Sequence, residues 1–367
     1  MEADRFITRP LSIALDGLRF LSALGVLAPH AAEFYDLKEA MPFTLRLSHG
    51  SVIVFFVLSG LVIADSALRR RTSLRDYAIA RAARIGPVAV PAVLLAALGY
   101  AAMRALDGPL PAGIAAEGLR SVATSLTFLS QSPLLGAPTW GNLPYWSLCY
   151  EVWYYALFGA GSFLSGWKRI AAVAALALLA GFNVLLLFPL WLAGAWLNRS
   201  GWARSLSARQ GVLYLLGCAA MLQVIRLFDL KALLWLRDQV PFSLNMSEWV
   251  LSDYPLALTV VVALAALRPL AGLATDWLER WEVPIRWAAG FSFSLYLFHY
   301  PLLAWMARFG PALPDGPWWV LAPIAATLVL CAGIAQLTER HTPAVRRWLD
   351  RATARRGEGA ELAQAKA

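Results

Sequence analysis

Long apolar runs separated by short polar segments dominate the chain. A helix needs about 20 residues to cross roughly 30 Å of hydrocarbon. Ten runs of suitable character lie at residues 11–31, 49–68, 84–103, 146–165, 169–183, 185–198, 210–228, 249–267, 287–307 and 317–338. The pattern predicts an all-α, polytopic membrane protein with about ten transmembrane helices.

The arginines predict on which side of the membrane each end lies. The apolar stretch 170–197 is long for one helix and short for two. If it were one helix, the cluster Arg199, Arg204 and Arg209 and the basic segment from Arg340 onward would lie outside. Lys and Arg concentrate in cytoplasmic loops, so two helices are favoured here, with both termini in the cytoplasm.

The composition identifies lipid as the solvent for most of the chain. Charged residues make up 15% of the chain and hydrophobic residues 59%, with a mean hydropathy of +0.58. The net charge of +9 does not indicate nucleic acid, because the basic residues lie in short clusters between apolar runs. The three cysteines are far apart in apolar segments, which predicts packing roles and no metal site.

The chain carries no recognisable soluble domain beside its apolar runs. The longest polar segment, 104–145, contains four prolines and is expected to combine loop, surface helix and re-entrant structure over a site. We predict a membrane domain at 1–350 and a flexible cytoplasmic tail at 351–367. Chemistry must therefore occur among the helices.

A few titratable residues interrupt the apolar runs. Each costs roughly 2.5–3.5 kcal/mol at the centre of a membrane helix, so it normally faces protein or water. The residues singled out are Asp16, Arg19, His30, Glu151 and His299. Asp16 and Arg19 share a helix face, where they can form either a functional group or an interfacial ion pair.

His30, Glu151 and His299 are expected at one depth, in the outer half of the membrane. A neutral imidazole can take a proton from a hydroxyl, and a carboxylate can hold the other ring nitrogen. We therefore predict His30 as a general base that Glu151 orients or stabilises. A buried histidine can also be a packing residue, and Ser59 is interpreted as helix packing rather than as a nucleophile.

Two arginines at the start of the third run have the spacing of a phosphate clamp. Arg81 and Arg84 lie three residues apart on one helix face, and guanidinium groups bind phosphate through forked hydrogen bonds. The alternative is a topological role, which the run 69–71 can supply by itself. Trp146 lies in an aromatic cluster that fits either an interfacial belt or sugar stacking.

Five stretches resemble the signatures of acyltransferase family 3, the integral-membrane enzymes that acylate bacterial polysaccharides and other glycans. In chain order they are LDGLR (15–19) followed by His30, FFVLSG (55–60), RAARIGP (81–87), WSLCYE (146–151) followed by Tyr155, and SLYLFHYP (294–301). Glu339 and Pro343 resemble the usual end of the domain. Cys149 and Tyr150 before Glu151 are an uncommon variant, and the hydrolase-like extracellular domain of some members is missing.

The resemblance implies a ten-helix fold in the bacterial inner membrane. The implied donor is acetyl-coenzyme A or another acyl-coenzyme A on the cytoplasmic side, with no metal. The implied acceptor is a carbohydrate or a lipid-linked glycan. The implied roles are catalysis by His30 and Glu151, donor binding by Arg81, Arg84 and Arg19, and substrate binding or support by Trp146, His299 and Tyr296.

Two alternatives of another class stay open at this point. A transporter or flippase of lipid-linked sugars could use the same histidines and glutamate as a proton relay, although no inverted repeat is visible. A structural subunit would leave the shared depth of the three groups unexplained. Direct transfer and an acyl-histidine intermediate need the same residues.

Overall fold

The computed structural model describes residues 5–37, 44–69, 73–109, 111–240, 244–312, 314 and 316–364, and their regular structure is helical throughout. The α-helices are α1 (Arg9–Phe34), α2 (Thr44–Arg69), α3 (Leu74–Asp107), α4 (Ile114–Leu126), α5 (Trp146–Phe163), α6 (Gly166–Ala180), α7 (Phe182–Leu197), α8 (Gly201–Ser205), α9 (Ala208–Gln239), α10 (Val250–Leu273), α11 (Thr275–Arg280), α12 (Glu282–Ala289), α13 (Ser292–Phe309), α14 (Leu321–Leu337) and α15 (Thr342–Gln364). Short 3-10 turns are η1 (Leu143–Tyr145), η2 (Asn245–Ser247), η3 (Pro317–Val320) and η4 (Glu339–His341).

Each predicted span overlaps one of these helices. Six helices of the described chain are long and apolar enough to cross a membrane, or up to seven if a bent pair counts as one span. They are α1, α2, α3, the first part of α9, α10 and the run from α14 into α15, and the bent pair is α6 with α7. The all-α fold with several membrane helices is confirmed, whereas the count of ten stays a prediction.

The ambiguous apolar stretch forms two helices that meet at Gly181. The axes of α6 and α7 are bent by 119° at this break. Gly181 has a φ of +87°, a left-handed conformation that side chains with a Cβ rarely adopt, and the ring of Pro133 occupies the space that a Cβ would need. Two helices were expected from the charge pattern, and glycine provides the break between them.

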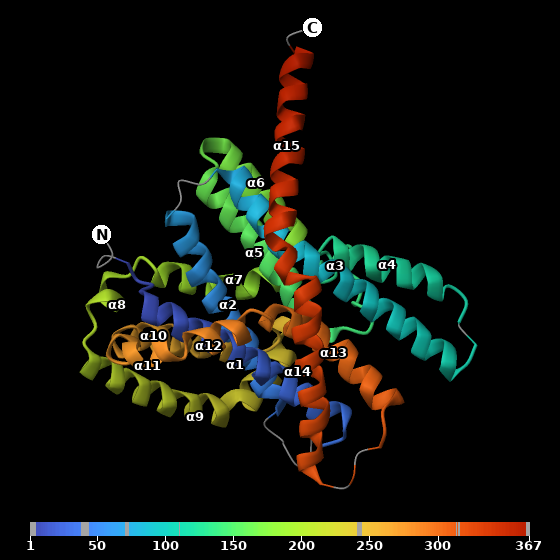
Figure 1. The fold of residues 1–367 in the computed structure, drawn as a ribbon, viewed down its shortest axis with the longest axis horizontal. Helices are drawn as coiled ribbons and strands as arrows, with labels where there is room; N and C mark the ends of the chain where they lie inside the picture. Colours follow the sequence, from blue (N-terminus) through green and yellow to red (C-terminus); the bar gives the residue numbers. More distant parts are fainter. Residues whose placement is uncertain are drawn as a thin grey trace.

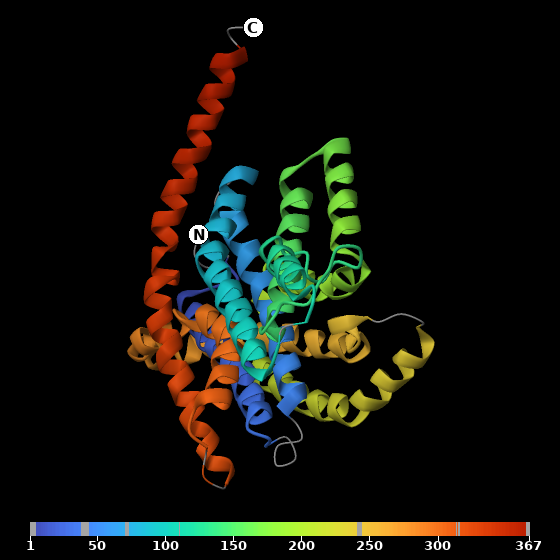
Figure 2. The same cartoon turned by 90° about the vertical axis from the view of Figure 1, so that its right-hand side faces the viewer.

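Groups of helices lie on opposite sides of the centre of the molecule (Figure 1). The helices α8–α12 lie on one side, and α4 lies with the end of α3 on the other. Helix α15 packs on the start of α3, where Arg75 donates to the carbonyl of Asp350 and to Thr353, and its far end projects beyond the other helices (Figure 2). Residues 351–364 continue this helix, and the predicted boundary at 350 stays a prediction.

The segment 104–145 contains the expected surface helix, α4, which is tied to the chain that follows it. Ser121 donates to the carbonyl of Pro138, and Ser125 shares a hydrogen bond with Thr139. The Tyr145 hydroxyl donates to the carbonyl of Ser125. These bonds fix η1 and the start of α5 in the interior, where Tyr145 is fully buried.

Helices α2 and α7 touch backbone to backbone at a pair of glycines. A Cβ added to Gly60 would lie 1.9 Å from the carbonyl oxygen of Trp191, and a Cβ added to Gly194 would lie 1.9 Å from that of Val57. In a membrane, where apolar side chains gain little by leaving lipid, such close approach of small residues is a main source of helix association. The sequence analysis interpreted Ser59 as helix packing; the close helix contact lies at its neighbour Gly60, and Ser59 itself hydrogen-bonds to Trp191 and Tyr155.

We expect Gly60→Leu to lower the melting temperature in detergent strongly, because the new side chain must push a backbone away. Overpacking typically costs about 1–3 kcal/mol, and a clash with a carbonyl belongs at or above the top of that range. Gly217→Leu in α9 is the matched control, since a Cβ there meets nothing within 4 Å. Equal melting temperatures for the two variants would contradict the contact.

Candidate active site

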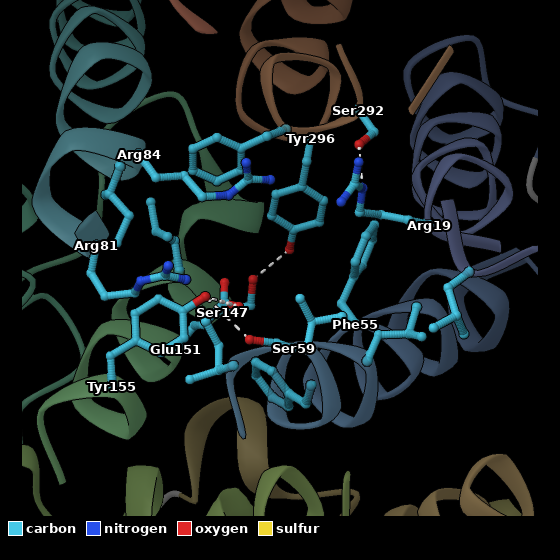
Figure 3. A pocket seen from close by; sticks show the side chains of 18 of the residues that line it. Arg19, Phe55, Ser59, Arg81, Arg84, Ser147, Glu151, Tyr155, Ser292 and Tyr296 are labelled. Carbon is cyan, nitrogen blue, oxygen red and sulfur yellow. Dashed lines mark hydrogen bonds between the residues drawn. The ribbon is translucent and has the colours of Figure 1, made fainter. Parts of the chain in front are cut away.

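A cavity of about 300 Å³ lies among α1, α2, α3, α5 and α13 (Figure 3). Three of the predicted donor-binding residues, Arg19, Arg81 and Arg84, line it together with Glu151 and Tyr296. They come from four helices that are far apart in the sequence. The cavity therefore combines three arginine side chains with two carboxyl groups, because Asp16, which pairs with Arg19, also lines it.

Arg19 is held in place by a group on its own helix, α1, and by groups on α12 and α13. Its Nη2 lies 3.2 Å from Asp16 Oδ1 and donates to the carbonyl of Ala289, and its Nε donates to Ser292 Oγ. Asp16 also binds Arg286 at 2.7 Å. The predicted pairing of Asp16 with Arg19 is confirmed, and it belongs to the cavity wall as well as to an ion-pair network.

Arg81 and Arg84 extend from one face of α3 into the same cavity, as their spacing predicted. Within the described ranges, neither forms an ion pair, and the buried Nε of Arg81 has no hydrogen-bond partner. The Arg81 guanidinium lies 5.9 Å from the ring centre of Tyr77 and 5.8 Å from that of Tyr155. Both arginines thus keep donors available to an anion.

Glu151 lies at the end of a chain of hydrogen bonds. The indole N–H of Trp191 donates to Ser59 Oγ at 3.1 Å. Ser59 then donates to the Tyr155 hydroxyl at 3.1 Å, and this hydroxyl donates to Glu151 Oε1 at 2.6 Å. Tyr155 has one hydrogen and donates it to Glu151, so Ser59 is the donor in its bond with Tyr155, and Ser59 accepts from the indole, which can only donate.

Tyr296 and Ser147 close one wall of the cavity. Their hydroxyl oxygens are 2.6 Å apart, and Tyr296 donates to the carbonyl of Pro144 at 3.0 Å. The ring of Phe55 packs edge-on against Tyr296 with a centroid distance of 5.5 Å. Tyr296 was expected to support the site, and it is a wall residue.

The two predicted histidines form a pair directly behind this wall. His30 Nδ1 lies 3.0 Å from His299 Nε2, and the two residues are 7% and 1% exposed. His299 Nδ1 faces the carbonyls of Leu295 and Tyr296 at 3.1 and 2.9 Å. Rings of Tyr296 and His299 are 6.1 Å apart, so the pair adjoins the cavity without lining it.

The surroundings fix the tautomers of a neutral pair. Carbonyls only accept, so His299 Nδ1 carries the hydrogen and its Nε2 is an acceptor. His30 must then donate through Nδ1, which leaves the lone pair on its Nε2. The sequence predicted His30 as a base with one ring nitrogen held, and the structure supplies the holder.

The sequence suggested that Glu151 holds this ring nitrogen of His30, but His299 does so instead. Among the described residues, His30 and Glu151 share no hydrogen bond, and Glu151 binds Tyr155 instead. The two groups lie apart because α5 begins inside the protein: Ser147, its second residue, is already opposite Tyr296. The common depth in the membrane stays a prediction. Glu151 follows one turn later, about 6 Å farther toward the arginines.

Pro301 explains how the start of α5 is anchored inside the protein. Proline has no N–H, so the carbonyl four residues earlier, on Leu297, loses its partner within α13. Asn142 Nδ2 donates to this carbonyl at 2.8 Å. Asn142 is 1% exposed, so the bond anchors the segment before α5 inside the protein.

The sequence analysis did not identify a second histidine cluster. His49 Nε2 lies 2.9 and 3.0 Å from the two carboxylate oxygens of fully buried Asp253, and Arg46 lies 3.6 Å from the same group. The ring of His49 stacks on Trp146 at 6.0 Å, so Trp146 belongs to this cluster rather than to the cavity lining. His49 and Asp253 also lie inside predicted apolar runs, and the rule applied to His30 would have found both.

The described residues hold no group of three His, Cys, Asp or Glu side chains arranged for a metal ion. All three cysteines are buried and free, with Cys149 near Ser130 and Cys218 near the carbonyl of Thr259.

The fold and the cavity define a multi-pass membrane protein with an arginine-lined site between its helices. A family model described as an acyltransferase domain matches residues 12–336, nearly the whole chain. The chain belongs to acyltransferase family 3 and is a membrane acyltransferase. No curated protein and no solved structure matches it.

We expect Asn142→Ala to destabilise the protein by about 1–3 kcal/mol, because it leaves the buried carbonyl of Leu297 unpaired. Adding Pro301→Ala should recover part of this loss, since alanine restores an N–H within reach of that carbonyl. Melting temperatures of the two single variants and the double variant in detergent test the coupling. Losses that simply add would show that Asn142 acts elsewhere.

Proposed function

We propose that this protein transfers an acyl group, acetyl in the simplest case, from acyl-coenzyme A to a hydroxyl group of a carbohydrate or lipid-linked glycan. One observation carries the proposal: a cavity with three arginines adjoins, through Tyr296, a histidine pair whose first member has a free lone pair on Nε2. Acyl transfer from a phosphorylated thioester to an alcohol needs an anion site beside a base.

The donor's phosphates suit the arginines. Guanidinium groups bind phosphate oxygens through paired, charge-assisted hydrogen bonds, and Arg81 and Arg84 have donors that no described carboxylate occupies. Glu151 would repel a phosphate, but a carboxylate held by Tyr155 can accept from the amide N–H groups of the donor's arm. The cavity thus offers different partners to the two parts of the donor.

His30 would then act as the general base. Its Nε2 takes the proton of the acceptor hydroxyl as the oxygen attacks the thioester carbonyl. The tetrahedral intermediate collapses, the carbon–sulfur bond breaks, and the coenzyme A thiolate takes the proton from His30. The hydrogen bond from His30 Nδ1 to His299 becomes charge-assisted while His30 is an imidazolium, which stabilises the transition state.

The wider setting of this reaction is also part of the proposal. We place the chain in a bacterial inner membrane with ten spans and both termini in the cytoplasm, so that the donor enters from the side of the arginines. Arg75, Arg81 and Arg84 all lie near the start of α3, which supports a cytoplasmic location for that end. An acyl-histidine at His30 is the competing chemical route.

Two substitutions should separate binding from chemistry. His30→Ala should keep the dissociation constant for acetyl-coenzyme A within threefold and lower transfer to a sugar acceptor by about 100-fold to 10,000-fold, the contribution of a general base. Arg84→Ala should raise that dissociation constant about tenfold through the loss of a charge-assisted bond at an exposed position. Radiolabelled donor and purified protein in detergent serve both measurements.

Arg75→Ala is the matched control, since Arg75 is on the same helix but binds α15. It should behave as wild type. Wild-type protein that neither binds nor consumes any acyl thioester would refute the donor, and proton-coupled movement of a lipid-linked sugar would then be tested first.

His299 should act as a positioning residue. His299→Phe removes the acceptor for His30 Nδ1, so the tautomer of His30 with its lone pair on Nε2 is no longer fixed. We therefore expect kcat to fall about 100-fold or more, while the KM for the donor changes less than threefold. His299→Gln, whose amide oxygen can accept the same bond, should recover at least tenfold of this loss. Equal rates for the two variants would mean that His299 only fills space.

A further inference from the structure

A second cavity, of about 410 Å³, lies between α3 and α5. Its lining is apolar apart from Arg81 and the hydroxyl groups of three tyrosines. On α3 it follows one continuous face, with lining residues at 74, 77, 78, 81, 82, 85, 86, 89 and 90, and on α5 it follows 152, 155, 156 and 159. We call it the side groove.

Small residues keep the side groove open. Ala78, Ala82 and Gly86 lie on the α3 face, opposite Ala156 on α5. A Cβ added to Gly86 would meet nothing within 4 Å, although glycine weakens the interior of a helix. The side groove is therefore open at Gly86 and has room for an added side chain there.

The side groove and the arginine cavity share part of their lining. Arg81, Ile85 and Tyr155 line both spaces. The Nε of Arg81 is buried at this junction and has no hydrogen-bond partner in the described part of the chain. Buried donors are almost always paired, so this N–H is suited to an acceptor that a ligand brings, such as a thioester or amide oxygen.

We propose that the side groove holds the hydrocarbon chain of the donor, so that the protein accepts acyl groups of medium length. The inference rests on the proposed donor site and names its substrate class. The thioester stays on the Tyr296 side of the arginine cavity, next to the proposed base, and the acyl chain runs from there past Tyr155 and Arg81, so that its outer methylenes lie along α3. Between Arg81 and Val90 that helix rises about 13 Å, far more than an acetyl group needs.

The occupant is a donor chain rather than a membrane lipid because the side groove shares Arg81, Ile85 and Tyr155 with the arginine cavity, where the donor's polar part is proposed to bind. The groove carries no second charge that would hold a lipid headgroup beyond Arg81. A lipid tail would fill the groove from its open side and would make donor affinity independent of chain length. The two occupants therefore predict opposite results.

The experiment measures dissociation constants for acetyl-, butyryl-, hexanoyl- and octanoyl-coenzyme A with purified full-length protein in detergent. Burial of one methylene is worth up to roughly fourfold in affinity, which corresponds to about 0.8 kcal/mol. With partial burial, octanoyl-coenzyme A should bind at least tenfold more tightly than acetyl-coenzyme A. Gly86→Leu should remove this gain while the constant for acetyl-coenzyme A stays within twofold.

Two further variants keep the result interpretable. Ala82→Leu fills the same groove from the next turn and should also flatten the chain-length profile. Gly217→Leu adds the same side chain in open space on α9, outside both cavities, and should keep the wild-type profile.

A flat profile in the wild type, or an unchanged slope in both groove variants, overturns the inference while leaving the donor site intact. Failure of every thioester to bind, acetyl-coenzyme A included, overturns the proposed donor site and this inference with it.

Discussion

The backbone contact of α2 with α7 at Gly60 and Gly194 sets the geometry on which the site depends. Only glycine at both positions lets Trp191 come close enough for its indole to reach Ser59. From Ser59 the hydrogen bonds continue to Tyr155 and end on Glu151. A packing contact between two helices thereby helps to determine where the Glu151 side chain lies.

The same chain of contacts separates the site into two chemical environments. On one side of Tyr296 lie three arginines and Glu151, which suit a ligand with several charges. On the other side His30 and His299 form a buried, uncharged pair with a defined tautomer. The Tyr296–Ser147 wall marks the boundary between the charged cavity and the histidine pair.

Proline and asparagine together carry the chain into this interior. The carbonyl that Pro301 releases in α13 would be costly in a membrane if it stayed unpaired. Asn142 pairs with it and draws the segment before α5 inward, so that Ser147 meets Tyr296 and Glu151 meets the arginines. A local defect in one helix is thus the attachment point for another.

The sequence by itself determined the helical elements, the membrane class and the family motifs, and it singled out titratable residues within the apolar runs, because hydrophobic runs and the cost of charge in lipid act locally along the chain. It also predicted that Arg81 and Arg84 share a face, since helical spacing fixes this. Only the tertiary structure decided which group meets which. His30 pairs with His299 and not Glu151, His49 meets Asp253 across two helices, and Arg81 joins two cavities. The reason is geometric: a partner on another helix depends on that helix's rotation and depth, and one residue of offset turns a side chain by about 100°.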